Sequence, residues 1–221
     1  MPQQIVYEQT PKKDISELLD ELQFEFTDAP SELLLHYLQR TVRDFCDRTN
    51  AVQRTVRIYP QAGVHNYLIE PTDDVDFIAI LSVQCTQCRY GNRAVRRVIA
   101  PVCDLFTDYD TVHVNNNELI FSHPRFGDCW NVIISVMPRL QDMEVDAVLV
   151  DRYAPAIIDG VRAELYALQD KPWSSLQRVQ SSLQRAQLCR AQYIQKCCTY
   201  SLDGLTEHQR GAIKARGPRA F

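Results

Sequence analysis

At the start of the chain the apolar positions repeat with a helical period. Residues 15–24, ISELLDELQF, predict a short helix, and Asp14 before them with Glu17 forms the capping pattern of a helix N-terminus. A second helix is predicted from Pro30, which suits a first helical turn, to about Asp47. The apolar stripe of this second helix consists of Leu34, Leu35, Leu38, Val42, Phe45 and Cys46.

From Arg54 to Val136 the period of the apolar positions changes to two, which predicts strands. Asn115-Asn116-Asn117 is typical of a hairpin turn, because asparagine tolerates left-handed backbone geometry. Strands this closely spaced favour an antiparallel sandwich or a small barrel. The predicted strands lie near residues 54–58, 67–69, 77–85, 94–99, 111–114, 118–121 and 130–136.

Helical periodicity returns near Val145 and continues to about residue 200. Pro155 is expected to loosen or kink an early turn. A break at Lys171-Pro172-Trp173 is followed by a long final helix that begins near Ser174. The stripe of the first helix is Tyr153, Ile157, Ile158, Val161, Leu165 and Leu168, and that of the second is Leu176, Val179, Leu183, Ala186 and Tyr193.

These patterns together predict an α+β fold, in which a helical bundle carries an inserted antiparallel β-sandwich or barrel. The helical parts are expected at 1–50 and 141–200, the β domain at 51–140, and an extended tail at 201–221. The tail is basic and lacks an apolar period, so we expect it to dock onto an acidic partner, the alternative being a solvated end without a role. The expected partner-binding residues are Arg210, Ile213, Lys214, Arg216, Arg219 and Phe221.

Composition narrows the class of protein. The chain has 221 residues, 45% of them hydrophobic and 24% charged, with a formal net charge of −4. This balance argues against a protein that coats nucleic acid over its whole surface. No secretory leader is expected, and no apolar run is long enough to span a bilayer, so we expect no membrane. The eight cysteines are therefore expected to be free thiols in a reducing cytoplasm.

The pair Cys85 and Cys88 is the main candidate for chemistry. With Cys103, Cys129 and His123 it suggests zinc, but structural zinc sites usually take two such pairs, and a second pair is missing. Buried thiols are the simpler interpretation, so no metal and no cofactor is expected. The sequence carries no P-loop, zincin or nucleophile-elbow pattern, and we expect no enzyme.

Two alternatives stay open at this point. One is a zinc-binding or thiol-based protein that uses Cys85 and Cys88. The other is a nucleic-acid-binding module built on a group of arginines and the basic tail, although no face of interleaved basic and aromatic residues is evident. The arginines of this group are Arg89, Arg93, Arg96 and Arg97.

The order of helices, sheet and helices, together with four short motifs, resembles the head-to-tail adaptor proteins of tailed bacteriophages, the short-tailed type above all. The family's aromatic-Cys-basic-Ser/Thr helix end is matched by Phe45, Cys46, Arg48 and Thr49. Its strand ending in proline is matched by 67–71, and a second such proline by Pro138. Its helix pattern with a downstream Lys-Pro-Trp is matched by Tyr153, Ile157, Gly160 and Lys171-Pro172-Trp173.

The resemblance implies a structural virion protein at the head–tail junction, made in the host cytoplasm. It would form a homo-oligomeric ring of about twelve subunits between the portal protein and the tail tube or nozzle protein. Genomic DNA would pass through the ring without sequence recognition. Gly160 would then allow a close approach of two helices, and Trp173 would anchor the loop between the last helices in the core.

Overall fold

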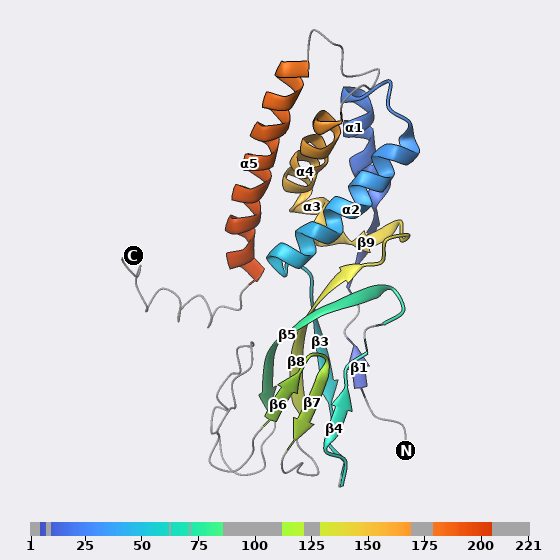
Figure 1. The fold of residues 1–221 in the computed structure, drawn as a ribbon. Helices are drawn as coiled ribbons and strands as arrows, with labels where there is room; N and C mark the ends of the chain where they lie inside the picture. The colour runs from blue at the N-terminus through green and yellow to red at the C-terminus, as the bar shows by residue number, and fades with distance from the viewer. Residues whose placement is uncertain are drawn as a thin grey trace, which may run out of the picture. The chain divides into compact units, whose positions relative to one another are not determined.

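The structure is a computed structural model that describes residues 5–7, 10–61, 63–70, 72–85, 112–121, 129–168 and 179–204. Its mixture of helices and antiparallel sheets (Figure 1) confirms the α+β class. By its contacts the chain divides into two compact units. A β unit comprises 1–9 and 53–136, and a helical unit comprises 10–52 and 137–221.

Within its described residues, the β unit contains two sheets. The first has the strand order β1-β3-β8-β5, and the second has the order β4-β7-β6. β3 pairs antiparallel with both β1 and β8, and β7 pairs antiparallel with both β4 and β6. The strands are β1 (Ile5–Tyr7), β3 (Gln53–Ile58), β4 (Asn66–Leu68), β5 (Val75–Cys85), β6 (Val112–Asn115), β7 (Glu118–Phe121) and β8 (Trp130–Pro138).

Aromatic rings join the two sheets. Phe121 of β7 stacks edge-on against Trp130 of β8 in the other sheet, with 5.2 Å between ring centroids, and against Tyr67 at 5.4 Å. Such tilted contacts are the arrangement that aromatic quadrupoles prefer. The predicted asparagine hairpin between β6 and β7 is present, with Asn116 at a φ of 51°. The sheets therefore share one aromatic core.

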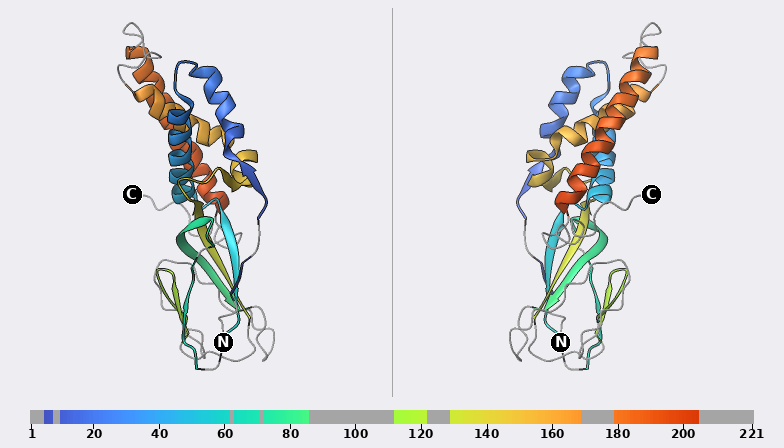
Figure 2. Two further views of the ribbon diagram at one scale, coloured as in Figure 1. Left: turned by 90° about the vertical axis from the view of Figure 1, so that its right-hand side faces the viewer. Right: turned by 90° about the vertical axis from the view of Figure 1, so that its left-hand side faces the viewer.

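The helical unit contains a short two-stranded sheet and the helices. β2 (Lys12–Asp14) pairs antiparallel with β9 (Glu144–Asp146). In Figures 1 and 2, α4 lies between α1 and α5, while α2 crosses them. The helices are the 3-10 turn η1 (Ile15–Leu18), α1 (Leu19–Glu25), α2 (Ser31–Thr49), α3 (Ala147–Asp151), α4 (Ala154–Ala167) and α5 (Val179–Gly204).

Most helix ends follow the local signals in the sequence. The Asp14 side chain accepts a hydrogen bond of 2.7 Å from the Ser16 amide, as the capping pattern predicted. α2 ends at Asn50, whose left-handed backbone (φ 51°) closes the helix. The kink predicted at Pro155 is wrong. Pro155 lies in the first turn of α4, where a missing amide hydrogen costs no helical hydrogen bond.

Three further expectations need correction. Val145 lies in β9 and not in a helix, because β2 supplies it with a strand partner from far along the chain. Leu183 is 36% exposed and does not belong to the packed stripe of α5. α5 continues to Gly204, so residues 201–204 are helical and not part of an extended tail. The strand expected at 94–99 lies outside the described residues.

Candidate interaction site

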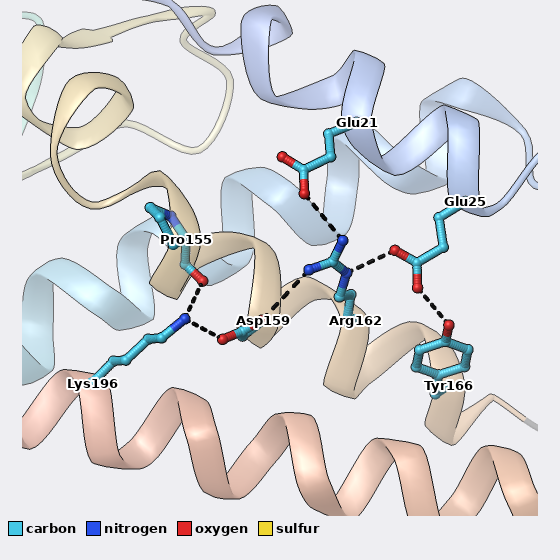
Figure 3. Close-up of polar contacts among 7 residues, drawn as sticks. All are labelled: Glu21, Glu25, Pro155, Asp159, Arg162, Tyr166 and Lys196. Carbon is cyan, nitrogen blue, oxygen red and sulfur yellow. Dashed lines mark hydrogen bonds and ion pairs between the residues drawn. The ribbon is translucent and has the colours of Figure 1, made fainter.

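A charged network holds α1 against α4 in the helical unit (Figure 3). The Arg162 guanidinium donates to Glu25 at 2.7 Å and to Glu21 at 3.1 Å. Burial opposes the charge of Arg162, but its hydrogen bond to Glu25 and the surrounding carboxylates raise the pKa of Arg162 overall. Tyr166, one turn further along α4, donates to Glu25 as well. Two glutamates of α1 thus bind side chains of α4.

The same network continues to α5. Asp159 is 7% exposed and forms an ion pair of 3.6 Å with Arg162. On its other side it pairs with Lys196 of α5, whose ammonium also donates to the carbonyl oxygen of Pro155 at 3.0 Å. Burying a carboxylate is costly unless such partners satisfy it. α4 is therefore tied by charge to the helices on both of its sides.

On another face of α4, Gly160 permits close helix packing. A Cβ atom at this position would lie 2.5 Å from the Thr41 methyl of α2 and 3.0 Å from the Tyr193 ring of α5. Any side chain would therefore push two neighbouring helices away. The close approach expected at Gly160 is confirmed.

Beside Gly160 the three helices enclose a hollow of about 380 Å³, which we call the α2–α4–α5 hollow. Its floor is largely apolar and is buried except at Ile194, which is 48% exposed, whereas charged side chains with exposed or half-exposed positions form its rim. The floor residues are Thr41, Gly160, Ala163, Tyr193 and Ile194. The rim residues are Arg40, Asp44, Arg48, Glu164 and Arg190.

The rim carries more positive than negative charge, with three arginines against two carboxylates. Asp44 accepts hydrogen bonds of 2.7 Å from Arg48 and from the Tyr193 hydroxyl. Glu164 accepts one of 2.9 Å from Arg190. Within the described part of the chain, Arg40 makes no hydrogen bond or ion pair and acts on Asp44 by its charge alone. Arg40 is thus available to an acidic group from outside.

Asp44 links the rim to stability at low pH. Burial by itself would raise the pKa of Asp44, but the hydrogen bonds from Arg48 and Tyr193 outweigh burial, so the pKa lies below its ordinary value. A carboxyl whose pKa is lower in the folded state stabilises the fold above its unfolded pKa, about 3.9 for aspartate. That contribution is lost as the pH falls through the folded pKa.

We therefore expect Asp44→Asn to lower the thermal midpoint at neutral pH, with a difference from wild type that shrinks as the pH falls below about 4. The measurement is melting by circular dichroism from pH 7 to pH 2. Asp47→Asn, an exposed position on the same helix, serves as the control and is expected to change little. A difference for Asp44→Asn that is constant over the whole pH range would contradict this account.

Three of the described cysteines are unsuited to nucleophilic chemistry. The thiols of Cys46, Cys189 and Cys197 have raised pKa values because of burial, the reverse of what a thiolate nucleophile requires. Within the described ranges, no group of three or more His, Cys, Asp or Glu side chains could hold a metal ion. Cys129 is a buried thiol.

Most residues singled out from the sequence lie outside the described residues. Cys85 ends β5, but its side chain is not described. The undescribed residues include all six expected partner-binding positions, namely Arg210, Ile213, Lys214, Arg216, Arg219 and Phe221. They also include Cys88, Cys103, His123, Trp173 and the arginines Arg89, Arg93, Arg96 and Arg97.

Sequence reasoning missed the α2–α4–α5 hollow. One signal was available, because Arg40, Asp44 and Arg48 follow each other at intervals of four and so form a row on one face of α2. The residues that α4 and α5 add to the hollow carry no such signal. Their place depends on how the helices pack.

Comparison with known protein families and curated proteins found no match. None of the helices within the described residues is long and apolar enough to cross a membrane. The fold and the surface chemistry of the two units therefore carry the functional argument.

Proposed function

We propose that this protein is a head-to-tail adaptor of a tailed bacteriophage, a structural protein without enzymatic activity. Its copies form a ring, of about twelve subunits by the family resemblance, between portal and tail. Genomic DNA passes through the ring without sequence recognition. The basic residues of the tail, 205–221, dock onto an acidic groove of the portal.

The observation that carries the proposal is the uneven surface of α5. One side of this helix is buried against its own unit by Ala186, Tyr193 and Cys197. Leu188 and Ile194 are 59% and 48% exposed on its other faces, where a solvent-facing helix normally carries polar residues. A long helix with apolar side chains on several faces suits lateral contacts between neighbouring subunits.

Two further features support a structural role over the alternatives. The buried thiols of Cys46 and Cys197 are poor nucleophiles, since burial raises their pKa values, so these two positions offer nothing to a thiol-based protein. The net charge of −4 suits a channel through which DNA slides, because strong phosphate contacts would retain it. The charged networks of α4 stabilise the fold and need no substrate.

The test is assembly on the portal protein of the same virus. We expect the full chain to form a closed ring on the portal, which electron microscopy with rotational averaging would show. A chain that ends at Gly204 should remain unbound. Melting behaviour of the shortened chain should match that of the full chain. Absence of any ring with the full chain, or salt-sensitive DNA binding in its place, would refute the proposal.

A further inference from the structure

Phe24 on α1 is an apolar side chain that its own unit leaves uncovered. It is 89% exposed, whereas Leu22 and Phe26 on either side are buried. Successive helical residues are rotated by about 100°, so Phe24 projects from the face opposite these two. Covering a phenylalanine side chain is favourable relative to leaving it in water. Phe24 is therefore an exposed apolar side chain that association with another protein surface can bury, and we call it the knob.

The surroundings of Phe24 are acidic. Asp20 precedes it by four residues and shares its face of the helix, and Asp28 lies three residues after the end of α1. Both aspartates are exposed, and among the described residues neither has an ion-pair partner. Glu21 and Glu25 are held by Arg162 on the side that faces α4. The knob thus presents a phenyl ring with unpaired carboxylates beside it.

The α2–α4–α5 hollow has the complementary properties. Its floor is largely apolar, its volume of about 380 Å³ exceeds what a phenyl ring requires, and its rim has surplus positive charge with Arg40 available. It also lies away from α1. On α4, Arg162 and Tyr166 face α1, whereas Gly160 and Glu164 line the hollow. A copy therefore cannot place its own Phe24 in its own hollow.

We propose that Phe24 of one copy inserts into the α2–α4–α5 hollow of the next copy, with the aspartates beside Phe24 facing the arginine rim. The proposal rests on the proposed ring and names the contact that would build it. A knob and a hollow at different places on one surface make a heterologous contact, which repeats from copy to copy and closes into a ring when the rotation allows. The charges steer the encounter between two copies, and the phenyl group of Phe24 supplies the buried anchor.

Photochemical cross-linking tests the contact directly. p-Benzoylphenylalanine, a photoreactive analogue, is placed at position 24, and equal amounts of isotopically light and heavy protein are mixed and irradiated, free at high concentration and on the portal. We expect cross-links between light and heavy chains that map to residues 40–48, 160–164 or 190–194. Cross-links within one chain, to the portal or to other segments, or no cross-linked dimer at all, would overturn the proposal.

Substitutions test the same contact by affinity. Phe24→Ala and Ile194→Gln are expected to raise the concentration needed for assembly at least about tenfold, as the loss of a buried anchor does. Arg40→Glu should weaken assembly and reduce its sensitivity to salt. Leu140→Ser, at an exposed leucine of the same unit (44% exposed), is the matched control and should assemble like wild type. All these positions are exposed or half-exposed, so melting curves should be unchanged.

The outcomes separate this proposal from the proposed function. Rings of normal occupancy formed by Phe24→Ala would overturn the contact and leave the adaptor role standing. Copies that cross-link as expected but never bind the portal would support the contact and refute the adaptor role.

Discussion

Replacing Gly160 by valine is expected to destabilise the helical unit by about 3 kcal/mol. A Cβ atom at this position lies 2.5 Å from the Thr41 methyl and 3.0 Å from the Tyr193 ring, so α2 and α5 must both move to make room. The better helix propensity of valine recovers only a fraction of that loss. The free energy of unfolding, measured by urea titration with circular dichroism, should fall accordingly, and the thermal midpoint should drop by on the order of 10 °C.

A second pair of variants isolates the contact with Thr41. Gly160→Ala should cost less than valine, because the gain in helix propensity of about 1 kcal/mol offsets part of the clash. Thr41→Ser removes the methyl group that lies nearest to the added Cβ. The double variant should therefore be more stable than the sum of the two single changes predicts. Strict additivity would show that the helices adapt without using the space at Thr41.

Phe45→Ala is expected to have the largest effect of a single truncation, about 3–5 kcal/mol. Phe45 of α2 is completely buried, and its ring contacts Tyr153 at 5.2 Å and Tyr200 at 6.2 Å between centroids. These three rings come from the N-terminal and C-terminal parts of the helical unit and hold them together. Unfolding in urea, followed at the helical signal, gives the free-energy difference.

The matched control is Phe24→Ala in the same unit. Phe24 is 89% exposed in the free protein, so its truncation should change the free energy of unfolding by less than about 0.5 kcal/mol. Comparable losses for the two phenylalanines would mean that Phe24 is covered in the free protein. That result would also remove the basis for its proposed role between copies.

Local patterns in the sequence predicted much of the secondary structure. The stripe of α2, the stripe of α4 as far as Leu165 and the asparagine hairpin were correct, because periods of 3.6 and 2 residues and left-handed asparagine are properties of adjacent residues. Leu168, predicted as the end of the α4 stripe, lies beyond the helix in extended backbone. The α+β class followed from the order of these patterns. Candidate chemistry was harder to predict, since composition left the state of Cys85 and Cys88 open and the structure does not describe the pair.

The sequence by itself determined where most of the longer helices and strands form, since their periods are encoded by neighbouring residues. Only the tertiary structure decided that Val145 belongs to a strand, because its partner Lys13 is remote in sequence. Likewise, helical spacing places Leu183 and Ala186 close together on α5, yet the first is exposed and the second buried. The hollow beside Gly160 exists because three helices meet there at a separation that no single helix encodes.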